Sequence, residues 1–450
     1  MNKICIPLGI ALLLTSTLSA QTVSLDNGIV QMEISLTGGI ITELGLFGVD
    51  INPLHEYGHF LCFDRWGPSS PEDKALGIPF HGEASKITWT LNQESSFDQG
   101  QHYTEMSCLL PIVNLGMNRK IYLNDNTSVF KVVEEITNHT DSLKVFNLVQ
   151  HPTLGAPFLD ETTIVDTQVD SGFSQSGNLP PASEDVITWP QTVVDGDSTD
   201  LRYLNVDHSW QSAVVTFILD EKEEYRWVTA VNPSLNLMLG YIWPASDYPW
   251  LNLWLRLDNN APFARGLEFG STGLHKTWPE LLGMEQIFGR KLYEEIGVND
   301  TIVKTYFAFM SKIPSDYKGV ESVTIDGEKI RVEEYDMEPE RVIELAIRDT
   351  LTGIEPTVHE ENEALILGQN YPNPVHQETS ISYTLSHEGR VTLELFNATG
   401  QLVQTLVNGF RVAGDHIVSL HASGLPAGIY SYRLRAGNSQ SQKKMILSNN

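Results

Sequence analysis

Short runs in which apolar and polar residues alternate recur along most of this chain, and they restrict its fold more than any other feature. Clear examples are residues 29–34, 130–136 and 250–257. Clusters of Gly, Pro, Asn and Asp separate such runs, as turns separate strands. Helical periodicity is scarce, and the best candidate for a short helix is 278–290. The pattern predicts an all-β fold, with a large antiparallel β-sandwich over residues 21–315.

The length and the charge distribution point to further modules. At 450 residues the chain is too long for one ordinary domain. Residues 315–365 hold 5 basic and 15 acidic side chains, a net charge of −10, whereas residues 366–450 hold 6 and 4, a net charge of +2. We therefore expect an acidic extension and linker over 316–365, with a hairpin that turns at Asp326-Gly327 and a further strand at 341–347. A separate small β-sandwich should follow over 366–450.

The first twenty residues have the three parts of a secretory signal. Lys3 supplies the positive start, an apolar run continues to about Leu14, and small and polar residues lead to Ala20. The apolar run is shorter than the roughly 20 residues that a membrane-spanning helix needs. Residues 1–20 are therefore expected to be a cleaved signal peptide, and the mature chain to be exported without a stable membrane span.

Charge excludes several classes of partner. The chain has 29 basic and 57 acidic residues, a formal net charge of −28. Such a chain repels phosphate backbones and anionic lipid surfaces, so neither nucleic acid nor a membrane surface is an expected partner.

Two cysteines remain after the expected cleavage, Cys62 and Cys108. An oxidising compartment permits a disulfide between them, and two free buried thiols are the alternative. The sequence leaves both possibilities open.

Several short motifs near the C-terminus occur in a characteristic order. They are QNYPNP at 369–374, TSISYTL at 379–385, LPAGIY at 425–430 and KKM at 443–445. Their order and spacing resemble the type A C-terminal sorting domain of the type IX secretion system. The resemblance implies that residues 366–450 bind the type IX secretion machinery. The protein would then cross the periplasm and the outer membrane and be secreted or attached to the cell surface.

Five motifs in the body also occur in a characteristic order. They are FDRWG at 63–67, GIPFHGEA at 77–84, QHPTLG at 150–155, VDHSW at 206–210 and ARGLEFG at 264–270. This order resembles the aldose 1-epimerase (galactose mutarotase) family over residues 21–315. The resemblance implies a galactose mutarotase-like sandwich that binds a carbohydrate and interconverts its anomers, with no metal and no organic cofactor.

The same resemblance implies roles for individual side chains. Glu268, ionised, would be the base that takes the proton of the anomeric hydroxyl, and His151, protonated, the acid that serves the ring oxygen. The sugar-binding side chains would be His81, Arg65, Asp207 and Trp89.

Two other functions remain open at this level. The same cleft could bind a carbohydrate without turning it over. Glycoside hydrolases and lyases also use large β-sandwiches, and Glu268 with Asp207 could supply the two carboxylates that a hydrolase needs.

Overall fold

The computed structural model describes residues 22–347 and 365–448, apart from residues 99, 170, 178, 180, 182–185, 195, 205–209, 220–221, 336–340, 371, 386–388, 398–401, 423 and 437–438. The expected signal peptide, 1–20, and Asp207 lie outside the described residues. The chain divides into two compact units, Met1–Pro356 and Thr357–Asn450. The acidic segment up to residue 347 thus belongs to the first unit.

The first unit is built on an eleven-stranded antiparallel sheet. Ten strands follow the order β1-β2-β3-β4-β9-β19-β18-β15-β11-β12, and β22 pairs with β9. Their bounds are β1 (Thr22–Asp26), β2 (Val30–Ser35), β3 (Ile40–Leu46), β4 (Leu54–Asp64), β9 (Lys144–Leu154), β11 (Ser171–Ser174), β12 (Ile187–Thr188), β15 (Ser212–Ile218), β18 (Trp250–Asp258), β19 (Ala261–Gly270) and β22 (Glu294–Ile296).

A second sheet of eight strands packs against one face of the first. Its order is β10-β16-β17-β23-β8-β7-β6-β5. The bounds are β5 (Thr90–Asp98), β6 (Gln101–Leu109), β7 (Leu115–Asn124), β8 (Val129–Asn138), β10 (Ile164–Thr167), β16 (Tyr225–Asn232), β17 (Leu237–Pro244) and β23 (Thr301–Lys312). One apolar core takes residues from both sheets. Trp243 of β17, for example, stacks on Phe269 of β19 with ring centroids 4.3 Å apart. The predicted all-β sandwich is therefore confirmed.

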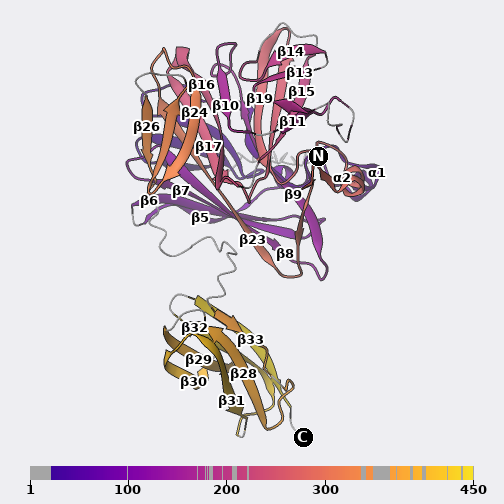
Figure 1. Cartoon of the computed structure of the whole chain (residues 1–450), viewed down its shortest axis with the longest axis vertical. Helices are drawn as coiled ribbons and strands as arrows, with labels where there is room; N and C mark the ends of the chain where they lie inside the picture. Colours follow the sequence, from indigo (N-terminus) through magenta and orange to yellow (C-terminus); the bar gives the residue numbers. More distant parts are fainter. Residues whose placement is uncertain are drawn as a thin grey trace, which may run out of the picture. The chain divides into compact units, whose positions relative to one another are not determined.

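The acidic segment adds a third layer. It forms the sheet β24-β25-β26, with β24 at Val320–Asp326, β25 at Lys329–Glu334 and β26 at Val342–Ala346. Its inner residues, such as Ile330 and Val332, share a core with residues of the eight-stranded sheet that face away from the main core. Figure 1 shows β24 beside β16 and β17. The expected hairpin and the additional strand are both present, and they cover the sandwich.

Short elements complete the first unit. Ser70 is the N-cap residue of helix α1 (Pro71–Leu76). Its hydroxyl and its backbone N–H form a capping box with Asp73. Helix α2 (Trp278–Met284) lies within the range predicted for a helix. The remaining small elements are η1 (Ala84–Lys86), η3 (Pro233–Leu235), and the paired strands β13 (Gln191–Val194) with β14 (Asp197–Asp200) and β20 (Gln286–Ile287) with β21 (Arg290–Lys291).

The second unit consists of two small sheets around a core of its own. One sheet has the order β27-β28-β31 and the other β30-β29-β32-β33. The bounds are β27 (Leu365–Leu367), β28 (Glu378–Leu385), β29 (Gly389–Asn397), β30 (Leu402–Arg411), β31 (Gly414–His421), β32 (Gly428–Ala436) and β33 (Ser439–Leu447). This is the small C-terminal β-sandwich that the turn pattern predicts.

Cys62 and Cys108 are free and buried, so of the two possibilities the structure has the separate thiols. Among the described residues, no helix combines the length and apolar character needed to cross a bilayer.

Candidate functional site

The candidate site lies on the face of the eleven-stranded sheet that does not contact the eight-stranded sheet. Side chains alternate between the two faces of a strand. In β9 and β19, Gln150 and Phe269 point toward the eight-stranded sheet, where Gln150 hydrogen-bonds Glu134 of β8 and Phe269 joins the core. Alternation therefore directs the adjacent residues, His151 and Glu268, to the other face.

A cavity of about 670 Å³ opens on that face, a size typical of a small-molecule site. Its floor comes from β4, β9, β15, β18 and β19, and its wall from the loops that follow β4 and β19. The lining residues are Ile40, Glu56, Tyr57, Phe60, Trp66, Phe80, His81, Ser85, Lys86, His151, Ser212, Val214, Trp254, Arg256, Glu268 and His275.

His151 and Glu268 form a buried pair in direct contact in this cavity. Nε2 of His151 lies 3.1 Å from Oε1 of Glu268, and both side chains are almost fully shielded from solvent. The strand register accounts for the contact: Gly266 pairs with Thr153 and Phe269 with Gln150, which places His151 opposite Glu268. Two residues of one sheet that face each other in this way are held without flexible loops.

The other sides of the His151 ring are also fixed. Nδ1 lies 3.0 Å from Oγ1 of Thr153, and the Thr153 hydroxyl in turn donates to the backbone carbonyl of His151 at 3.4 Å. Since that hydroxyl proton is used, Oγ1 accepts from Nδ1–H, which leaves Nε2 as the acceptor toward Glu268. The ring also stacks on Phe60, at 4.1 Å between centroids.

Burial sets the protonation of the pair. Desolvation raises the pKa of Glu268 to about 8 and lowers the pKa of His151 to about 3. Near neutral pH these shifts favour a protonated Glu268 carboxyl and a neutral His151 imidazole. In the free protein the directions of these shifts favour a neutral pair over the expected ionised Glu268 and protonated His151, because the cavity offers little solvation to either charge.

The second oxygen of Glu268 is free. Within the described residues, Oε2 is buried and has no hydrogen-bond partner of normal geometry, and the same holds for Nε1 of Trp66. The Trp66 indole is nevertheless close enough to oppose part of the rise in the Glu268 pKa. A buried carboxyl oxygen without a hydrogen-bond partner costs free energy. A ligand hydroxyl that binds there would therefore be stabilised.

His81 is presented by a strained turn beside the pair. Its φ of 66° lies in the left-handed region that non-glycine residues rarely adopt. Gly82 follows at φ 77°, and a Cβ there would meet the carbonyl oxygen of Phe63 at 2.3 Å. The backbone N–H of Gly67 donates to Nδ1 of His81 at 3.3 Å, so the neutral ring carries its proton on Nε2. Burial keeps the pKa of His81 well below its usual value.

His275 belongs to the site and was not among the residues predicted from the sequence. Its ring lies 5.3 Å from that of His81 and 5.1 Å from that of Trp66, between centroids. Gln175 fixes the loop after β19: its Oε1 accepts from the backbone N–H of His275 at 2.9 Å, and its Nε2 donates to Gly273. The only sequence signal was a histidine seven residues after Glu268. Burial lowers the pKa of His275 to about 4.

The remaining predicted site residues are placed differently. Arg65 is paired with Asp64 at 2.5 Å and with Asp73 at 3.5 Å, and it does not line the cavity. Trp89 lies in the core, where its indole N–H donates to the carbonyl of Ala84 at 3.0 Å. Asp207 lies outside the described residues. The structure thus brings together His81, His151 and Glu268 and leaves Arg65 and Trp89 beside the site.

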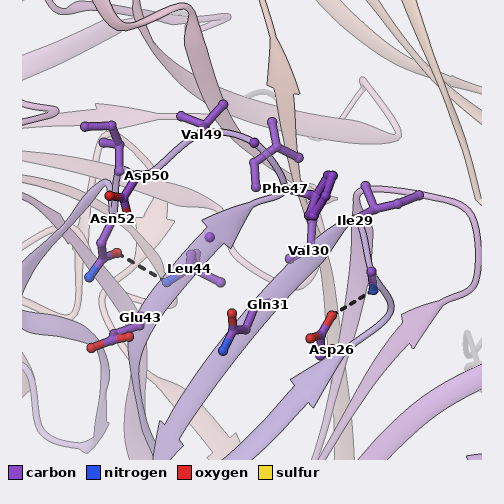
Figure 2. A pocket seen from close by; sticks show the side chains of 15 residues that line it. Asp26, Ile29, Val30, Gln31, Glu43, Leu44, Phe47, Val49, Asp50 and Asn52 are labelled. Carbon is purple, nitrogen blue, oxygen red and sulfur yellow. Dashed lines mark hydrogen bonds between the residues drawn. The ribbon is translucent and has the colours of Figure 1, made fainter.

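A second cavity of about 720 Å³ lies along β1, β2 and β3 (Figure 2). Its polar side chains hold local turns: Oδ1 of Asp26 accepts from the N–H of Gly28 at 2.7 Å, and Oδ1 of Asn52 accepts from the N–H of Leu44 at 3.2 Å. Its lining includes no histidine. It offers no acid–base pair comparable to His151 and Glu268.

The described ranges contain no group of three or more His, Cys, Asp or Glu side chains arranged to hold a metal ion.

Comparison with known proteins gives a family match for the second unit. Residues 369–448 match the secretion system C-terminal sorting domain. The second unit is a secretion sorting domain. This confirms the resemblance seen in the C-terminal motifs, and it indicates that the protein is exported to the cell surface or beyond. A search of curated proteins gives no match for the chain.

Solved structures similar to the first unit include three lactobacillal proteins. They are a galactose mutarotase related enzyme from Lactobacillus acidophilus (10% identity, TM-score 0.48, covering 65% of this chain and 98% of that one), a galactose mutarotase-like protein from Lactobacillus casei (14%, 0.47, 65% and 100%) and galactose 1-epimerase from Lactobacillus acidophilus (14%, 0.45, 65% and 94%). Likeness this remote says nothing about activity, which has to be inferred from the side chains in the cavity.

Proposed function

We propose that this protein is an exported sugar epimerase of the aldose 1-epimerase type, which interconverts the anomers of a reducing sugar. The observation that carries the proposal is the buried pair His151–Glu268, with Nε2 and Oε1 3.1 Å apart and with no hydrogen bond of normal geometry at Oε2 among the described residues, in a cavity lined by aromatic rings. Anomer exchange needs one group that accepts a proton and one that donates a proton, and the two side chains of this pair can fill these two roles.

The proposed reaction uses one proton, which the pair His151–Glu268 donates to the sugar and later recovers. In the sugar complex the single proton of the pair is carried by Nε2 of His151, which gives it to the ring oxygen, while Glu268 takes the proton of the anomeric hydroxyl. The bond between the anomeric carbon and the ring oxygen breaks as the aldehyde C=O forms. After rotation of the aldehyde, the reverse transfers close the ring on its other face, and the pair again holds one proton.

The other cavity residues suit a sugar. The Nε2–H of His81 is available to donate to a ring or hydroxyl oxygen. His275 stays neutral over the physiological range, so its ring can donate from one nitrogen and accept at the other. Phe60, Trp66 and Trp254 offer apolar faces to the C–H groups of a pyranose ring.

The test is the optical rotation of freshly dissolved α-glucose and α-galactose with the full-length mature chain. The proposal expects equilibrium to be reached faster than in buffer, in proportion to protein concentration. Calorimetric binding of the sugars without faster rotation would instead favour a carbohydrate-binding protein without turnover. New reducing ends released from a polysaccharide would favour a hydrolase.

Export is tested separately through the sorting domain. We propose that deletion of residues 366–450 leaves the protein in the periplasm, because the remaining chain lacks the signal for the outer-membrane step. Fractionation of cells that express the full-length or the truncated chain measures this. Undiminished surface or extracellular protein after truncation would contradict a role of this domain in export.

A further inference from the structure

Strand β4 contains a local distortion at the mouth of the cavity. The pairing of β4 with β9 shifts register between Leu54 and His59, so residues 55–58 bulge away from the sheet. Gly58, at φ 65°, makes the bulge possible, because a Cβ there would meet the carbonyl oxygen of Ile41 at 2.5 Å. Bulges of this kind redirect side chains and are common next to active sites.

The bulge places two rings against a third from the start of β19. The ring of His55 lies 4.3 Å from that of Tyr57 and 4.8 Å from that of Phe263. Gly155 at the end of β9 permits this approach, because a Cβ there would meet Cα of His55 at 2.7 Å. We call His55, Tyr57 and Phe263 the aromatic shelf.

The aromatic shelf is accessible and continuous with the cavity. Tyr57 is 43% exposed, and His55 and Phe263 are partly exposed. Tyr57 also lines the cavity, and so does Arg256, whose guanidinium lies 5.5 Å from the centre of the Phe263 ring. A ligand that leaves the cavity past Tyr57 and Arg256 therefore meets the shelf directly.

We infer that the aromatic shelf binds a second pyranose ring, so that the substrate is a glycan of at least two sugar units with its reducing end at His151 and Glu268. Exposed rings beside a polar cavity suit the apolar C–H face of a pyranose. The Nδ1 of His55 accepts from the backbone N–H of Tyr57 at 3.3 Å, which leaves Nε2–H to donate to a hydroxyl. The assignment of the reducing end rests on the proposed function, whereas binding of the second ring does not.

The test is calorimetric binding by the full-length mature chain, with glucose and galactose compared with cellobiose, maltose and lactose. At least one disaccharide should bind about tenfold or more tightly than its own reducing-end monosaccharide. Phe263→Ala should abolish that advantage and leave monosaccharide binding unchanged, because Phe263 does not line the cavity. Phe263→Tyr, which keeps the ring, should retain the advantage.

Phe97→Ala is the matched control, since Phe97 is also an exposed aromatic residue but lies on β5 of the other sheet. It should change neither affinity. The inference is overturned if no disaccharide binds more tightly than its monosaccharide, or if Phe263→Ala weakens both classes equally. Tight disaccharide binding without accelerated mutarotation would instead reject the proposed turnover and keep the shelf as a binding site.

Discussion

Gln150 and His151 are consecutive residues of β9 whose side chains serve opposite faces of the sheet. Nε2 of Gln150 donates to Oε2 of Glu134 at 2.7 Å inside the core, and Nε2 of His151 lies 3.1 Å from Oε1 of Glu268 in the cavity. Glu134 is in turn bound by Arg119 through two nitrogens, at 2.8 and 2.6 Å. A buried polar network in the core thus lies directly behind the pair His151–Glu268.

Replacing Glu134 with Gln should destabilise the first unit strongly. The change leaves the buried guanidinium of Arg119 without its counter-charge, a loss that typically costs about 3–5 kcal/mol. Denaturant unfolding followed by tryptophan fluorescence measures the effect. Lys329→Ala removes one partner of the exposed pair with Glu344 and is the control that should change little. Equal effects of the two variants would contradict a special role for the buried network.

The buried pair His151–Glu268 should also affect how stability depends on pH. Glu268 has a raised pKa, so the folded state keeps a proton that the unfolded chain loses above about pH 4.5. The contribution of Glu268 to stability should therefore fall between about pH 4.5 and 8, by up to about 1.4 kcal/mol per pH unit.

Glu268→Gln removes this loss, because glutamine does not titrate. The variant should gain stability relative to the native protein as pH rises from 5 to 8, measured as the difference in Tm at each pH. A difference that stays constant over this range would show that Glu268 is ionised in the folded protein. His151 acts in the opposite direction: its lowered pKa predicts stability that is lost as pH falls from about 6.5 toward 3.

The sequence predicted the parts of the molecule that depend on local pattern or on ordered motifs. Alternation and turn residues were enough for the all-β fold and for the hairpin at Asp326-Gly327. Motif order pointed to His81, His151 and Glu268. The sheet register brings His151 and Glu268 together, and a turn places His81 beside them. Motif order could not show that His151 and Glu268 touch, since that depends on the register between β9 and β19.

Other features depend on contacts that no motif records. His275 reaches the cavity because Gln175, a hundred residues earlier, holds its loop. Trp89 packs in the core instead, with its ring 5.0 Å from the Arg119 guanidinium. Arg65 is held by Asp64 and lies over Trp278. These contacts determine which polar and aromatic residues face the cavity.

Replacing His275 with Phe should weaken sugar binding more than it slows the chemistry. Phenylalanine keeps the ring packing against Trp66 and His81 but loses both ring nitrogens. Loss of one hydrogen bond to the sugar should raise KM or Kd about tenfold, with kcat changed less than about threefold. His102→Phe, at a remote pair with Asp125, is the control and should change neither. A large fall in kcat with unchanged affinity would make His275 part of the proton transfer instead.

The central claim is that His151 and Glu268 transfer protons as one unit. Glu268→Gln keeps the shape of the side chain but cannot exchange a proton, and His151→Asn removes the imidazole. Each should lower kcat by about a hundredfold or more, and the double variant should be little worse than the worse single one. The pH profile of native kcat should fall on both sides, with the alkaline limb near the Glu268 pKa of about 8.

The most direct measurement is the mutarotation rate of the Glu268→Gln protein, followed by polarimetry at saturating sugar, with its sugar affinity measured by calorimetry on the same sample. The account predicts that the rate is reduced about a hundredfold or more while the affinity changes less than about threefold. A rate close to that of the native protein would contradict it, because Glu268 would then have no part in the proton transfers.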